Sequence, residues 1–209
     1  MDECCESKGK ELSQLRVRHK RVLLAVLAIN LLMFAVELVS GLLSHSTSLL
    51  ADSLDMLGDA LVYIFSIFVI EKSSTWQARA SLAKGLVMLV FGLLVLVEAS
   101  AKLSSGTIPE APTMTGIGLL ALAMNGACFF LLWSHRGDNL NMRSTWICSR
   151  NDVIANAGVI AAGVLTFSVH SNWPDIVIGS VIALIFLRSA WDVVAESRRA
   201  LKANHRISQ

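Results

Sequence analysis

The chain has 209 residues, of which 54% are hydrophobic and only 16% are charged. Soluble domains carry roughly 25% charged residues, so this composition excludes an ordinary soluble domain. The net charge of +2 does not suggest a nucleic-acid partner, and four cysteines in so long a chain do not suggest a disulfide scaffold.

Six apolar stretches are long enough to cross a bilayer, which takes about 20 mostly apolar residues. They predict an all-α, polytopic protein with six transmembrane helices and no second soluble domain. A basic tail (1–21) precedes this membrane domain (22–194), and a second basic tail (195–209) follows it. The predicted spans are Val22–Leu43, Leu49–Ile70, Leu82–Ala101, Met114–Trp133, Trp146–Val169 and Ile176–Val194.

The positive charges predict the orientation of these spans. Of 18 lysines and arginines, only Lys102 falls on one of the two sides. Because positively charged loops stay in the cytoplasm, both termini are expected there. The protein itself is expected in a bacterial cytoplasmic (inner) membrane. On the opposite side, Glu98 and Lys102 are four residues apart and are expected to form an ion pair.

Acidic residues within the second predicted span indicate a cation site. Asp55 and Asp59 are one helical turn apart, so they share a helix face, and Asp52 falls near the same stripe. Ionisable groups inside a membrane are costly and usually functional. Carboxylates this close repel one another unless a cation or protons neutralise them.

The fifth predicted span repeats the spacing with different chemistry. Cys148 and Asp152 are again one turn apart, and Asn156 extends the stripe by another turn. Together with Asp55 and Asp59, they form a candidate four-ligand site for a divalent metal. Tetrahedral coordination of this kind suits zinc, and a thiolate favours softer ions such as cadmium. Alternatively, Cys148 packs as a small hydrophobic residue.

Further polar groups are candidates for accessory roles beside this site, among them Asp52 and Asn156. Glu37 is either an accessory proton or cation site, or a buried acid bonded to a neighbouring helix. Asn125 is expected to form a hydrogen bond between helices. The tail residues Cys4 and Cys5 are a candidate for capturing a soft cation.

Several of these segments resemble the cation diffusion facilitator family of metal transporters. The first span carries Glu37 and the turn Gly41-Leu-Leu-Ser44, and the second carries Ala51-Asp52 with the Asp55/Asp59 pair. The remaining similar segments are Asn139-Leu-Asn-Met-Arg143 with Asp152, Trp173-Pro174-Asp175, and Leu187-Arg-Ser-Ala-Trp191. The resemblance covers the whole six-span region.

Two departures from the family pattern affect what the resemblance implies. Cys148 occupies the position of a histidine in the fifth-span motif, which favours soft ions over the usual zinc. Family members usually also carry a cytoplasmic C-terminal domain, whereas this chain is expected to be a short member without it. Any homodimer is therefore expected to form through the transmembrane helices.

The resemblance implies a secondary transporter, not an enzyme, that exports zinc or cadmium, with cobalt or iron as further candidates. Export would exchange the metal for protons, since both compete for the same carboxylates. The metal is cargo, and no bound cofactor is expected. The partners are the metal, protons and the lipid bilayer. The alternatives are a non-transporting metal-binding or sensor subunit and an intramembrane metalloenzyme, although no His-Glu-x-x-His motif is present.

Overall fold

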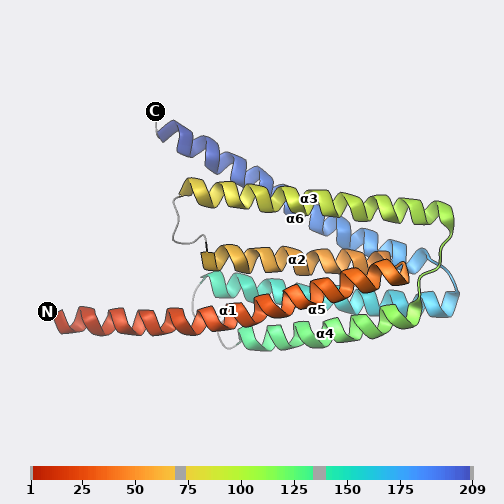
Figure 1. Cartoon of the computed structure of the whole chain (residues 1–209), viewed down its shortest axis with the longest axis horizontal. Coiled ribbons are helices and arrows are strands. Elements are labelled where there is room, and N and C mark those ends of the chain that lie inside the picture. The colour runs from red at the N-terminus through yellow and green to blue at the C-terminus, as the bar shows by residue number, and fades with distance from the viewer. Residues whose placement is uncertain (1, 69–73, 134–139, 208–209) are drawn as a thin grey trace.

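The computed structural model describes the backbone of residues 2–68, 74–133 and 140–207, and side chains mainly over residues 21–64, 76–133 and 152–203. The described residues form six α-helices and no strand, and the helices lie alongside one another in one bundle (Figure 1). The predicted all-α fold is confirmed. The helices are α1 (Asp2–Ser44), α2 (Thr47–Phe68), α3 (Ser74–Ser105), α4 (Ala111–Trp133), α5 (Leu140–Val169) and α6 (Trp173–Ile207).

Helices α1 and α6 extend well beyond the predicted spans. Helix α1 begins at Asp2, so the N-terminal tail is continuous with the first span, and α6 includes most of the C-terminal tail. The chain has three prolines, and none of them lies in either tail. Pro112 and Pro174 instead lie in the first turns of α4 and α6, where a missing N–H group costs nothing. The basic composition of the tails therefore does not coincide with the ends of these helices.

The bundle has two distinguishable ends. Both termini lie at one end, on the left in Figure 1, which we call the near end. At the opposite, far end, α1 meets α2, α3 meets α4 and α5 meets α6. In each of these turns the helix is followed directly by a residue in the left-handed region: His45 (φ 52°), Gly106 (φ 67°) and His170 (φ 52°). The tight turn at His45 brings the start of α2 directly beside the end of α1.

Apolar side chains cover the outside of the bundle, and polar side chains lie inside it. Exposed residues include Leu43, Val97, Phe130 and Phe167. The buried polar residues are Asn30, Glu37, Asp52, Lys102, Asn125, Asp152, Asn156 and Asp175, together with several serines and threonines. A surface this apolar suits lipid rather than water.

Within the described part of the chain, five helices are long and apolar enough to cross a membrane. They are α1, α3, α4, α5 and α6. Helix α2 carries three aspartates, but its 22 residues span about 33 Å at 1.5 Å per residue, enough for the hydrocarbon core of roughly 30 Å. It packs against α1, α3, α5 and α6, so it lies in the interior of the bundle. This arrangement accounts for a polar helix inside a multi-pass membrane protein.

Candidate metal site

A pocket with a volume of about 620 Å³ lies among α2, α3, α5 and α6. Its charged lining residues are Asp55 and Asp59 from α2, Asp152 from α5, and Lys84 from α3. Most of the remaining lining is apolar and comes from α6, including Ile178, Ile182 and Phe186. Three of the four predicted metal ligands therefore face one cavity.

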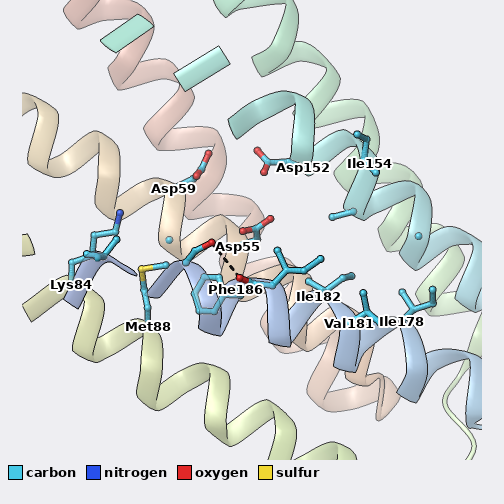
Figure 2. Close-up of a pocket in the computed structure, with 16 residues that line it drawn as sticks. Asp55, Asp59, Lys84, Met88, Asp152, Ile154, Ile178, Val181, Ile182 and Phe186 are labelled. Carbon is cyan, nitrogen blue, oxygen red and sulfur yellow. Dashed lines mark hydrogen bonds between the residues drawn. The ribbon is translucent and has the colours of Figure 1, made fainter. Parts of the chain in front are cut away.

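The three carboxylates gather in one part of this pocket. Figure 2 shows Asp59 and Asp152 on facing helices, with Asp55 one turn from Asp59 along α2, while Ile178 and Val181 lie farther along the cavity. The one-turn spacing of the α2 pair places both side chains on the pocket face, as the sequence predicted. Because α5 packs against α2, Asp152 joins them from a segment almost 100 residues away.

The electrostatic surroundings of Asp152 are dominated by other acids. Its carboxyl group lies within electrostatic reach of the carboxyl groups of Asp59, Asp55 and Asp52. Grouped carboxylates repel one another when ionised, so protons or a cation must neutralise part of their charge. A cation placed among these groups would take the place of protons and relieve the repulsion.

The carboxylates share a pocket without yet forming a coordination shell. Among the described side chains, no three His, Cys, Asp or Glu residues lie close enough together to hold a metal ion as they stand. The fourth predicted ligand, Cys148, belongs to α5 one turn before Asp152, but its side chain lies outside the described part of the chain. The same is true of the side chains of Cys4 and Cys5. Ligation would thus require the carboxylates to move toward one another.

Comparison with known proteins identifies the family. Residues 23–202 match the sequence model of the cation efflux transmembrane domain. The chain belongs to the cation efflux family. Transporters, rather than enzymes, make up this family and the relatives that the chain matches.

The relatives are bacterial and distant. One is the "Cadmium, cobalt and zinc/H(+)-K(+) antiporter" of Bacillus subtilis (strain 168), which is 24% identical over 58% of this chain and 40% of its own length. The "Zinc transporter ZitB" of Escherichia coli (strain K12) is 27% identical over 78% of this chain and 56% of its own length. The zinc transporter ZitB of Yersinia pestis is 25% identical over 85% of this chain and 61% of its own length. The chain therefore spans about two-fifths to three-fifths of the length of these relatives.

A chain of hydrogen bonds lies next to the pocket of this cation efflux protein. Asn125 Nδ2 of α4 donates to Asn156 Oδ1 of α5 at 3.2 Å, which confirms the expected bond between helices. Asn156 Nδ2 in turn donates to both carboxylate oxygens of Asp52, at 3.1 and 2.9 Å. Asp52 is thus held by α5, and it borders the pocket rather than lining it.

Glu37 is buried without a hydrogen bond. It is 0% exposed, and among the described residues neither carboxyl oxygen has a hydrogen-bond partner. Its charge interacts with those of Asp52 and Asp55. The alternative in which Glu37 is bonded to a neighbouring helix is therefore not what the structure shows, and an accessory role beside the pocket acids stays a prediction.

Two pocket residues were not singled out in the sequence. Lys84 and Met88 are one turn apart on α3 and both line the cavity. In the sequence, Lys84 is one of 18 lysines and arginines, and Met88 is one of seven methionines. Their shared one-turn spacing was the only available signal, and it does not reveal which helix face meets α2. A half-buried basic residue therefore lines the same pocket as the three acids.

A second polar cluster lies at the far end and corrects the expected pairing of Lys102 with Glu98. Lys102 Nζ donates to Asp175 Oδ2 of α6 at 2.6 Å and to the carbonyl oxygen of His45. Glu98 instead accepts a hydrogen bond from Thr47 Oγ1 at 2.8 Å. The expectation from sequence was wrong because Asp175, 73 residues from Lys102, competes for its ammonium group in the folded chain.

Proposed function

We propose that this chain exports divalent transition metal ions, zinc and cadmium foremost, from the cytosol in exchange for protons. The proposed ligands are Asp55, Asp59, Cys148 and Asp152. The observation that carries the proposal is the convergence of three carboxylates from two helices on one cavity inside an apolar bundle. A multi-pass protein gains nothing in stability from such a group of acids, so a ligand for them is the simplest reason for their presence.

The names of the relatives support the choice of cargo and counter-ion. These names mention cadmium, cobalt and zinc transport, and one names protons and potassium as the exchanged ions. The pocket chemistry agrees with exchange, since grouped carboxylates that protons neutralise without a metal must release those protons when a divalent ion binds. Transport therefore accounts for more of the observations than a sensor subunit does, and the family argues against a metalloenzyme.

The proposal is tested by changing Asp59 to asparagine. The amide keeps the size of the side chain but removes the charge that a divalent ion needs in a medium of low dielectric constant. In proteoliposomes, Asp59→Asn should reduce proton-driven zinc and cadmium transport by more than the roughly 10–100-fold that loss of an outer-shell partner costs. The matched control is Asp192→Asn, the same change at an exposed position of α6. Unimpaired transport by Asp59→Asn would remove the acids from the site.

We also propose that both termini are cytoplasmic, which makes the far end the side of release. The argument is the distribution of lysine and arginine, in which only Lys102 belongs to the far end. A cysteine at exposed Ser104 should react with a membrane-impermeant thiol reagent in intact cells, and a cysteine at Gln209 should not. The reverse labelling pattern would invert the direction of transport.

A further inference from the structure

We propose that Lys102 and Asp175 form a latch that holds α6 against the start of α2 and closes the metal path at the far end. The inference rests on the proposed function, because it assigns to this cluster the control of access to the pocket. It concerns residues that line no part of the pocket. Three features of the structure carry it.

The first feature is the completeness of the bonding around Asp175. Its carboxylate accepts hydrogen bonds from Ser46 Oγ (2.8 Å), Thr47 N (2.8 Å), Ser48 N (3.0 Å) and Ser48 Oγ (2.6 Å), in addition to the bond from Lys102. Asp175 is 0% exposed and Lys102 is 3% exposed. One side chain of α6 thus accepts hydrogen bonds from two of the free N–H groups at the start of α2, with favourable charge at a helix N-terminus.

The second feature is direct backbone contact just below this cluster. Gly179 lies one turn after Asp175 on α6, and a Cβ atom there would lie 2.7 Å from Ser48 N and from the carbonyl carbon of Thr47. No side chain fits in so small a space. Helices α2 and α6 therefore touch through their backbones at this level and leave no passage between them.

The third feature is the position of this contact relative to the pocket. Ile178 precedes Gly179 and is the pocket-lining residue of α6 that lies nearest to the far end in sequence. The cavity runs along α6 from this residue toward Ser189 and Val193. The contact at Gly179 thus adjoins the far-end limit of the cavity. Moving α6 away from α2 there would extend the cavity to the far end, and such a movement must first break the bonds to Asp175.

Asp175 also differs from the pocket acids in whether its oxygens are available to bind a metal ion. Because Asp175 is fully engaged by donors of the protein, it offers nothing to a metal ion and can stay paired while cargo binds. Each bond is individually weak enough to break in a rocking movement of the helices, whereas together they favour the closed arrangement. An ordinary structural ion pair would stabilise the fold without changing access, so the test must measure access.

The test measures labelling of a cysteine at Ile178 by a membrane-impermeant thiol reagent. The reagent is applied to sealed vesicles on the side at which a Ser104→Cys marker reacts. Peptide-resolved mass spectrometry allows the native cysteines to remain. The Ile178→Cys change is combined with Asp175→Asn, or with Lys102→Met and Asp175→Asn together, which leaves no unpaired buried charge. Both combinations should raise labelling at position 178 by about tenfold or more, as expected for a loss of charge-assisted bonds.

The matched control combines Ile178→Cys with Asp192→Asn, an exposed site on the same helix, and should label as slowly as Ile178→Cys alone. Unchanged labelling in both latch variants, with the Ser104 marker reacting normally, would overturn the latch. Labelling is measured without metal. A failure of zinc transport would therefore reject the proposed function while leaving the latch intact, and unchanged labelling in a protein that transports zinc would do the opposite.

Discussion

Asp152 and Asp175 are both buried aspartates in one bundle, but their surroundings are opposite. Asp175 at the far end is surrounded by donors: a lysine, two hydroxyl groups and two backbone amides. Asp152 in the pocket has Asp55, Asp59 and Asp52 as its charged neighbours. An acid whose charge is compensated by donors of neighbouring helices helps to hold those helices together. An acid grouped with other acids costs stability, and this cost is recovered only when a ligand or protons arrive.

The largest expected effect that separates the two aspartates concerns the stability of the metal-free protein. Asp175→Asn should lower the free energy of unfolding by about 3–5 kcal/mol, because it leaves Lys102 buried without its partner. Asp152→Asn should instead raise it by about 1 kcal/mol, the order of the repulsion between two unit charges roughly 4 Å apart in water. Thermal unfolding in detergent with a chelator at alkaline pH, where the acids are ionised, measures both changes.

Removing both members of the latch separates two contributions to the free energy of unfolding. One is the loss of the interaction itself, and the other is the cost of leaving one buried charge without a partner. The double variant with Lys102→Met and Asp175→Asn should return to within about 1–2 kcal/mol of the wild type, since no buried charge remains. Destabilisation of Asp152→Asn to the same extent as Asp175→Asn would show that the pocket acids are structural. The contrast between the two regions would then be lost.

A smaller effect is expected at Cys148, where the question is which metal the pocket prefers. Sulfur is more polarisable than nitrogen or oxygen, so a thiolate favours cadmium relative to zinc. Cys148→His should shift the cadmium-to-zinc transport ratio toward zinc by about tenfold, which corresponds to about 1.4 kcal/mol. Cys148→Ser should weaken the transport of both metals, and that of cadmium more. Identical ratios in all three proteins would mean that Cys148 packs near the pocket without binding metal.

The last comparison concerns the hydrogen-bond chain next to the pocket, where the smallest change is expected. Asn125→Ala removes the donor to Asn156 but leaves the bonds from Asn156 to Asp52 in place. Hydrogen bonds between membrane helices contribute about 0.6 kcal/mol on average, so the loss of stability should be of that order. Metal transport should change little. A loss above about 2 kcal/mol, beyond the range known for such bonds, would show that Asn125 supports Asp52 more directly than the structure indicates.

Local sequence patterns were sufficient to predict the helices of this protein and part of its candidate site. The length and apolarity of six segments predicted the helices, since a backbone in lipid must satisfy its own hydrogen bonds and the helix does so within one segment. The one-turn spacing of Asp55 and Asp59 predicted a shared face, because 3.6 residues per turn determine it. The resemblance of the second-span and fifth-span motifs to a transporter family agreed with the family match over residues 23–202.

Local sequence patterns did not predict the contacts between distant segments. Lys102 has Glu98 as a neighbour one turn away, and only the fold brings Asp175 closer to it. Lys84 and Met88 look like ordinary loop-border and core residues until α3 packs beside α2. Helical periodicity and hydropathy were enough to predict which residues share a helix face and which segments suit lipid. They could not predict which faces meet, because helix packing depends on the shapes of whole surfaces, down to a glycine at position 179 that lets two backbones touch.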